Sequence, residues 1–342
     1  MSALVLPFPN QHRRALLLAL GLLLASVALL LLGVSVGSTG FESVRNMLDD
    51  AQALQIVREI RLPRTVGAWL AGALLGLAGA VAQGLFRNPL ADPYLLGSAS
   101  GASLGVAGAM ALFGVSPLAM HWLARIGLTG AAFVGAVLAV LLTLLLAKGV
   151  QHTLRLLLAG VIVGVVLGAF TSLILLLTPE IMQAMQSFML GSTGFVGWSA
   201  CAVMAAVLGA STLAAWMMSH VLDGLALGES TAQSLGLRLA QMRVALVAVL
   251  ALATGTAVAQ TGLIAFVGLA APHLVRSVVK TTHGRLIVLA SLMGAVLLTA
   301  ADTLARWLVA PQELPVGVLT AVLGGGYLLW LMHRHTGRGA GL

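Results

Sequence analysis

The residues of this chain that could do chemistry are few, and the first candidate is a serine. Gly101, Ser103 and Gly105 fit the pattern G-x-S-x-G, in which a serine nucleophile lies between a strand and a helix and is served by a histidine and an acid. Here small and apolar residues flank the pattern on both sides, as they would inside a single membrane helix. The pattern therefore indicates helix packing, and we predict that the chain is not an enzyme.

Motifs for nucleotide and metal binding are absent from the sequence. The chain has two lysines, Lys148 and Lys280, and neither belongs to a GxxxxGK[ST] phosphate-binding loop. There is no HExxH pattern, and the single cysteine, Cys201, has no partner at a metal-binding spacing. We therefore predict no metal site, no cofactor bound by this chain and no hydrolysis of ATP by it.

One acidic and one basic residue lie four positions apart within a long apolar run. Asp302 and Arg306 would share one face of a helix, where they could form an ion pair. Pairing lowers the cost of placing either charge close to lipid, whereas an intramembrane carboxylate is by default a candidate for function. The sequence leaves both roles open for Asp302.

The elements that must position these residues are membrane-spanning helices. Of the 342 residues, 60% are hydrophobic and 8% are charged, whereas soluble domains carry about 25% charged residues. Apolar runs of about 20 residues, long enough to span a bilayer as helices, recur along the chain. We predict an all-α polytopic membrane protein in a single domain, residues 1–342. Its ten spans are expected at 15–35, 63–84, 94–114, 118–147, 154–178, 195–219, 240–260, 263–279, 285–309 and 315–333.

The distribution of lysine and arginine predicts the orientation in the membrane. With the N-terminus inside, the cytoplasmic segments hold 12 of the 18 basic residues and three of the 10 acidic ones. The positive-inside rule then places both termini in the cytoplasm. The first span is too long for a signal peptide and is expected to stay uncleaved. The net charge of +8 follows from this topology, and we predict no nucleic-acid binding.

Glycines recur at four-residue spacing within the predicted spans. Small residues let membrane helices approach closely, which replaces the hydrophobic force that is missing in lipid. We therefore expect helix contacts, in preference to flexible hinges, at Gly72 and Gly76, at Gly101 and Gly105, and at Gly160, Gly164 and Gly168.

Two segments between spans contain apolar residues but are too polar to cross a membrane. Residues 42–59, in which Ser43 is a plausible N-cap and the apolar residues have helical spacing, are predicted to form an amphipathic helix on the outer face. Residues 222–236 lie on the cytoplasmic side and are long enough for one or two short surface helices. They could be a solvated loop, or they could dock on another protein.

Four strings, in this order, resemble one family of transport proteins. They are RLPR at 61–64, QGLFRNPLADPYLLGSASGASLG at 83–105, GLIAFVGLAAPHLVR at 262–276 and ELPVGVLTAVLGGGYLLWLM at 313–332. The chain is similar to the FecCD-type permeases of ATP-binding-cassette (ABC) importers for iron-siderophores, haem and cobalamin, the group that includes the membrane subunit of the vitamin B12 importer. The resemblance covers nearly all of the chain after the first span.

The resemblance implies a fold, partners and a location. The fold is that of a type II ABC importer permease, which works as a homodimer in the bacterial inner membrane. Two ATPase subunits, which bind ATP and magnesium, dock on the cytoplasmic face. A periplasmic or lipid-anchored binding protein delivers the substrate from outside. The 222–236 segment would then be the loop that couples the permease to its ATPase.

Residue roles follow from the same resemblance, by position. Outward-facing arginines that receive acidic residues of the binding protein are expected at Arg61, Arg64 and Arg306. A narrow cytoplasmic gate is expected at Asn88, Leu90 and Thr153. The residues of ATPase coupling are expected to be Leu225, Leu227, Gly228, Ala232, Leu235 and Gly236.

The function implied is the import of a metal chelate from periplasm to cytoplasm by alternating access. An ion-coupled secondary transporter is the alternative, and it would need intramembrane carboxylates and inverted repeats. Only Asp302 meets the first requirement. A membrane-embedded enzyme is the third hypothesis and depends on Ser103 alone. No residue in the sequence identifies the cargo.

Overall fold

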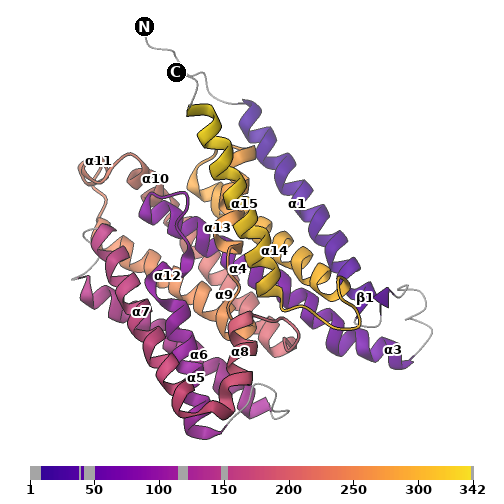
Figure 1. The fold of residues 1–342 in the computed structure, drawn as a ribbon. Helices are drawn as coiled ribbons and strands as arrows, with labels where there is room; N and C mark the ends of the chain where they lie inside the picture. The colour runs from indigo at the N-terminus through magenta and orange to yellow at the C-terminus, as the bar shows by residue number, and fades with distance from the viewer. Residues whose placement is uncertain (1–8, 38–39, 42–50, 115–121, 148–152, 340–342) are drawn as a thin grey trace.

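The computed structural model of the chain describes residues 9–37, 40–41, 51–114, 122–147 and 153–339. Helices make up almost all of this part (Figure 1). The strands found there are two residues long: β1 (Val36–Gly37) pairs antiparallel with β2 (Gly40–Phe41). The prediction of an all-α protein is confirmed.

Each predicted span corresponds to one helix among the described residues. These helices are α1 (Pro9–Ser35), α4 (Leu62–Phe86), α5 (Ser98–Phe113), α6 (Trp122–Leu146), α7 (Thr153–Leu177), α9 (Trp198–Met217), α12 (Leu239–Thr261), α13 (Val267–Val278), α14 (His283–Trp307) and α15 (Val316–Gly339). Seven described helical segments are long and apolar enough to cross a membrane, and α5 and α15 contribute shorter apolar helices. The remaining helix, α13, has 12 residues and rises about 18 Å, which is too short to cross alone.

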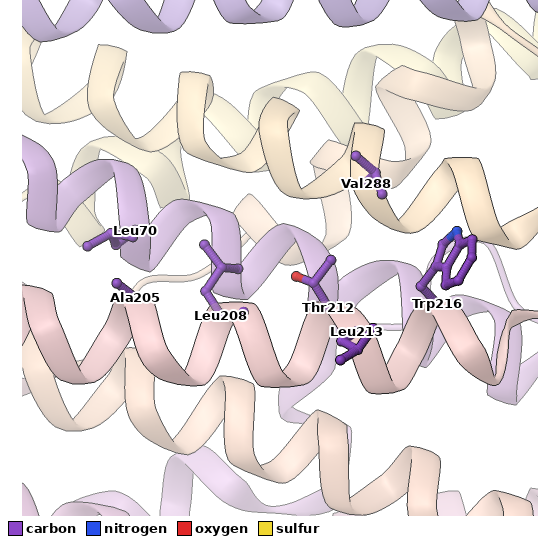
Figure 2. A pocket seen from close by; sticks show the side chains of 8 residues that line it. Leu70, Ala205, Leu208, Thr212, Leu213, Trp216 and Val288 are labelled. Carbon is purple, nitrogen blue, oxygen red and sulfur yellow. The ribbon is translucent and has the colours of Figure 1, made fainter.

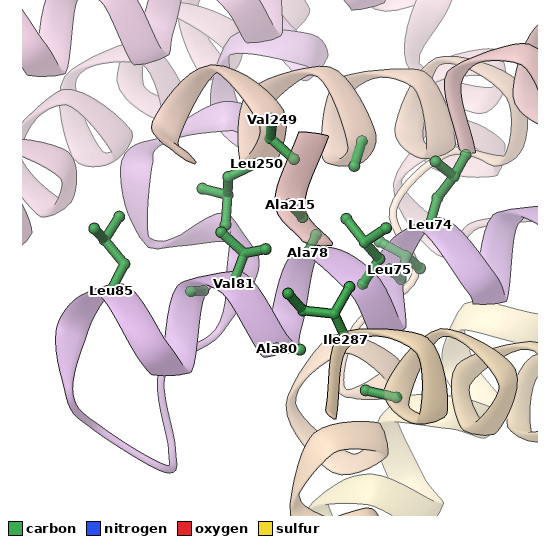
Figure 3. Close-up of a cluster of buried hydrophobic side chains, with 14 of the residues drawn as sticks. Leu74, Leu75, Ala78, Ala80, Val81, Leu85, Ala215, Val249, Leu250 and Ile287 are labelled. Carbon is green, nitrogen blue, oxygen red and sulfur yellow. The ribbon is translucent and has the colours of Figure 1, made fainter. Parts of the chain in front are cut away.

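Helix α4 forms the centre of the bundle. In the most apolar stretch of the helical segment Gln52–Phe86, which includes α4, 89% of the residues are buried. This is expected for a helix that is apolar on all sides. Its neighbours include α9, α12, α13 and α14. Figure 3 shows Leu75 and Val81 of α4 among side chains of the surrounding helices, including Leu250 of α12 and Ile287 of α14. By contrast, α1, α7 and α9 leave most of their apolar side chains exposed, as expected for helices that face lipid.

Glycines set the closest helix contacts. A Cβ on Gly72 or Gly76 of α4 would overlap a carbonyl oxygen of α14, and one on Gly101 or Gly105 of α5 would overlap a carbonyl oxygen of α6. The expectation of packing is confirmed at these four positions. It is also confirmed at Gly160 of α7, where a Cβ would overlap Leu95 O.

The last two glycines of the α7 series are different. At Gly164 a Cβ would make only an ordinary contact, with Ser100 Oγ at 3.6 Å, and at Gly168 it would meet no described atom within 4 Å. The predicted packing role is therefore wrong for Gly168 within this chain.

The predicted outer surface helix continues into the second span. Residues 42–50 lie outside the described part of the chain. Helix α3 (Ala51–Ile56) and the π-helical turn η1 (Val57–Arg61) run into α4 without a break. Pro63 has no N–H to donate, and the N–H of Leu62, just before it, bonds to Val57 O five residues back. The predicted boundary between surface helix and span is therefore absent.

The segment 222–236 contains two short helices, as its length suggested. They are α10 (Ser219–Ala226) and α11 (Glu229–Ser234). In Figure 1 both lie at the end of the bundle where α1 begins, and β1 lies at the opposite end, where α1 finishes. Three short helices complete the fold: η2 (Pro93–Leu96), η3 (Pro179–Ile181) and α8 (Met182–Leu190).

Candidate functional site

An ion cluster made of Arg64, Asp302, Arg306 and Glu313 joins α4 to α14 and to the connection after it. Arg64 Nη2 lies 3.3 Å from Asp302 Oδ1, and Arg64 Nη1 lies 2.7 Å from Glu313 Oε2. Arg306 Nη2 lies 2.8 Å from Asp302 Oδ2. Asp302 is 0% exposed and Arg306 is 1% exposed. Two positive and two negative groups together offset much of the cost of removing these charges from water.

Arg306 is held entirely by groups of its own chain. Its Nη1 donates to the carbonyl oxygens of Gly33 and Val36 at 2.7 and 3.1 Å, at the end of α1, and its Nη2 lies 3.4 Å from Thr65 Oγ1. Helix α1 covers Arg306 and its guanidinium is occupied, so its role in docking stays a prediction. The suggested pair of Asp302 and Arg306, four residues apart on α14, is confirmed.

A loop residue that the sequence did not single out completes this cluster. Thr193, between α8 and α9, donates its hydroxyl to Asp302 Oδ1. The cluster therefore ties together α1, α4, α14 and the connection before α9. Both carboxylate oxygens of Asp302 lie within ion-pair distance of an arginine, as expected for a structural ion pair.

The other two predicted docking arginines are more accessible. The side chain of Arg64 is 11% exposed, and that of its partner Glu313 is 34% exposed. Arg61, in the turn before α4, points Nη1 at Val34 O, 3.5 Å away. These residues lie at the end of the bundle where α1 finishes (Figure 1).

The turn 87–92 connects α4 to η2 and contains two of the predicted gate residues. The N–H groups of Arg87 and Asn88 donate to Gly84 O and Gln83 O, which closes the last turn of α4. Asn88 Oδ1 accepts from Leu90 N at 2.9 Å. Leu90 is 51% exposed. The structure thus supplies a small, internally bonded turn with an apolar side chain at its tip.

The turn ends at a buried carboxylate. Asp92 Oδ1 accepts from Tyr94 N at 2.8 Å and so caps η2. Burial raises the pKa of the Asp92 carboxyl, and the hydrogen bond from Tyr94 opposes that shift. The third predicted gate residue, Thr153, is the first residue of α7. Its side chain lies outside the described atoms, so its role stays a prediction.

The predicted coupling residues fall into two groups. Leu225 and Ala232 are 0% exposed, whereas Leu227 and Leu235 are 67% and 63% exposed. The first pair holds α10 and α11 against the chain, and the second pair is open to a partner. Gly228 and Gly236 have φ of 110° and 81°, a conformation that favours glycine. The side chains of Leu225 and Ala232 are internal, so they are not available for direct contact in this structure, and the coupling role of the segment stays a prediction.

A further contact fixes α10 to the start of α14. Asp223 Oδ1 accepts from His283 N at 3.0 Å and lies 2.7 Å from His283 Nδ1. No sequence pattern predicted this pair, since 60 residues separate its members.

An apolar groove lies between α4, α9 and α14. Its volume is about 580 Å³, and Figure 2 shows Leu70, Leu208, Trp216 and Val288 along it. The lining is apolar apart from the hydroxyl of Thr212 and the indole N–H of Trp216. It offers no convergent set of polar groups, which a site for a polar ligand would need.

The structure assigns no chemistry to the motif residue Ser103. It lies within α5 and is buried, so the strand that a nucleophile elbow requires does not precede it. Among the described residues, no group of three or more His, Cys, Asp or Glu side chains could hold a metal ion.

A bundle of long apolar helices around a buried central helix is the architecture of a polytopic membrane protein. Within that class, the chain belongs to the FecCD transport family, whose family model matches residues 18–334. The resemblance suggested by the four sequence strings is confirmed, and the chain is a permease of the ABC transporter type.

Named relatives and a solved structure agree with this family. The chain is 38% identical over 325 residues to the hemin transport system permease protein of Yersinia pestis, covering 93% of this chain and 96% of that protein. It is 37% identical over 333 residues to the vitamin B12 import system permease protein of Klebsiella pneumoniae, covering 96% and 97%. An inward-facing metal-chelate type ABC transporter matches with a TM-score of 0.82 and 28% identity, covering 92% and 98%. Proteins of this family are translocation components.

Proposed function

We propose that this chain is the translocation subunit of an ATP-driven importer for a bulky metal chelate, namely a ferric siderophore, haem or cobalamin. Two copies form a homodimer in the bacterial inner membrane and carry the chelate from periplasm to cytoplasm by alternating access. Two separate ATPase subunits bind and hydrolyse ATP with magnesium. The observation that carries the proposal is the family match over residues 18–334, together with relatives named for hemin and vitamin B12 import.

The arrangement of the bundle supports an orientation with both termini in the cytoplasm. The 222–236 segment lies at the end where α1 begins, and Arg64 and Glu313 belong to the opposite end (Figure 1). The excess of lysine and arginine marks the first end as cytoplasmic. The ATPase would then contact the exposed Leu227 and Leu235, and the binding protein would approach Arg61 and Arg64.

Uptake by the reconstituted complex tests the function. In proteoliposomes with its ATPase and binding protein, the permease is expected to accumulate one of haemin, cyanocobalamin or a ferric siderophore when ATP is supplied. Collapse of the proton and sodium gradients is expected to leave that uptake unchanged. Uptake that stops with the gradients and persists without the ATPase would contradict the proposal and favour a secondary transporter.

Docking of the binding protein is expected to depend on Arg61. Arg61→Glu should weaken docking by at least about tenfold, or about 1.4 kcal/mol, because the reversed charge repels acidic side chains of the partner. The effect should shrink at high salt. Binding kinetics on permease in nanodiscs measure it, and Arg58→Glu, whose side chain is 79% exposed one turn away, is the matched control.

Glu313 provides a second test, in which docking of the binding protein is expected to become tighter. Because Glu313 already neutralises Arg64 at 2.7 Å, an acidic residue of the partner must compete with it. Glu313→Gln is therefore expected to strengthen docking. If Arg61→Glu behaves like Arg58→Glu, and Glu313→Gln has no effect, the binding protein docks elsewhere.

A further inference from the structure

Arg87 has an unusual backbone for its residue type. Its φ and ψ are 51° and 34°, in the left-handed region, at the C-cap of α4. Glycine or asparagine is usual there, and a larger side chain costs about 1–2 kcal/mol. Among the described non-glycine residues, only Phe266 also has positive φ. Such strain persists where the surroundings hold it, and it gathers at switching segments.

The side chain of Arg87 reaches the 222–236 segment through a shared acceptor. Glu229 Oε1 lies 3.5 Å from Arg87 Nη2 and 2.7 Å from Arg243 Nη2. Glu229 begins α11, Arg87 ends α4 and Arg243 belongs to α12. One carboxylate oxygen therefore joins three elements.

The two contacts of Glu229 differ in strength. Arg243 is 4% exposed, so its short contact with Glu229 is little screened by water. The side chain of Arg87 is 41% exposed and its contact is longer, which makes this pair weak and easy to break and remake. Arg243 thus holds the carboxylate in place, and Arg87 is the movable partner.

Movement of Arg87 would carry the whole 87–92 turn. Arg87 directly precedes Asn88, whose side chain binds Leu90 N and whose carbonyl oxygen accepts from Ala91 N at 3.1 Å. These bonds make residues 88–91 a compact unit. A displacement at Arg87 therefore moves Leu90, the exposed side chain of that unit.

We propose that Glu229 is a positioning residue that transmits movement of the ATPase-docking segment to the gate turn, with Arg87 as the receiving group and Arg243 as the anchor. The inference rests on the proposed function, since it takes residues 222–236 as the ATPase contact and Asn88 and Leu90 as the gate. When α11 moves with the ATPase, Arg243 keeps the Glu229 carboxylate with α12, and the weaker contact between Glu229 and Arg87 breaks or re-forms. The strain of the left-handed backbone of Arg87 favours movement of the turn when that contact breaks.

A labelling experiment on the complete complex tests the relay without knowledge of the cargo. Leu90→Cys is introduced with Cys201→Ser, and the complex in nanodiscs is treated with a polar maleimide, without nucleotide or with ATP and vanadate. The labelling rate is expected to differ between the two states. Glu229→Gln and Arg87→Gln should each abolish that difference. Arg238→Gln, an exposed arginine of the same region, should preserve it.

Further variants separate a relay from a merely structural role. Arg87→Lys keeps the charge and should restore part of the nucleotide-dependent difference. The double variant Arg87→Gln with Glu229→Gln should be no worse than either single variant, because both remove one contact. The relay is overturned if Glu229→Gln keeps the full difference in labelling rate. It is also overturned if Leu90→Cys with Cys201→Ser is labelled at the same rate with and without nucleotide.

Failure of the relay can be told apart from failure of the proposed function. Leu227→Asp with Leu235→Asp is expected to prevent co-purification of the ATPase. If the ATPase still binds this variant, the docking assignment falls, and the relay falls with it. If binding is lost but Glu229→Gln still shows the nucleotide-dependent difference, the docking assignment stands and the relay alone is wrong.

Discussion

Asp302→Ala is expected to lower the free energy of unfolding of the permease by about 3–5 kcal/mol, the usual cost of breaking a buried ion pair from one side. Asp302 is 0% exposed and lies between Arg64 and Arg306. Its loss would leave the guanidinium of Arg306, 1% exposed, without a carboxylate. Thermal unfolding in detergent, followed by the fraction of monodisperse protein, measures the loss.

Two further variants define what the Asp302 result means. Glu59→Ala removes an acid whose side chain is 58% exposed and 4.0 Å from Arg58, so it should leave the unfolding temperature unchanged. Asp302→Leu combined with Arg306→Met replaces the pair by apolar groups and should recover much of the stability. Equal stability of Asp302→Ala and Glu59→Ala would show that the cluster does not hold the helices together.

The positions of the helices could be predicted because the signal is local. Long apolar runs and polar turns such as 87–92 are visible in the sequence without knowledge of the fold. The exception is 263–279, the shortest of the ten predicted spans. Gly262 and Phe266 have φ of 69° and 68°, so the chain turns there and α13 begins only at Val267. Backbone reversals of this kind leave little trace in an apolar sequence.

Contacts of charged side chains could likewise be predicted when the partners are close in sequence, and could not when they are far apart. The pair of Asp302 and Arg306 follows from a spacing of four residues on one helix. The contacts of Asp302 with Thr193 and of Arg306 with Gly33 span 109 and 273 residues. A single sequence contains no signal for such separations. The resemblance groups Arg306 with Arg61 and Arg64, but only the packing of α1 determines that Arg306 is covered.

Residues 222–236 show a third reason why a prediction from sequence was incomplete. Leu225, Leu227 and Leu235 are equivalent in the sequence, as apolar residues among polar ones. The turn at Gly228, with φ of 110°, separates α10 from α11 and determines which leucine faces inward. Helical spacing across the whole segment could not separate Leu225 from the other two, because the segment is not one helix.

Gly79→Ala is expected to cost about 1–3 kcal/mol of stability or more, since it overpacks a contact that has no room to adjust. A Cβ on Gly79 of α4 would overlap the carbonyl oxygen of Gly268 in α13. Helix α13 has little space to retreat, because a Cβ on Gly268 would itself lie 2.5 Å from Pro93 Cγ. The same thermal assay measures the effect, as a lower unfolding temperature and a smaller yield of folded protein.

Gly168→Ala is the matched control for Gly79→Ala. A Cβ at Gly168 of α7 meets no described atom within 4 Å, and alanine favours a helix over glycine by about 1 kcal/mol, so stability should be unchanged or slightly higher. Comparison of the two variants also distinguishes a packing role of Gly79 from a role as a flexible hinge. If a glycine is needed for bending, its replacement would reduce nucleotide-driven movement of the 87–92 turn. The folded protein would remain stable. That outcome for Gly79→Ala would contradict the packing role, because the overlap with Gly268 acts on the folded state before any movement begins.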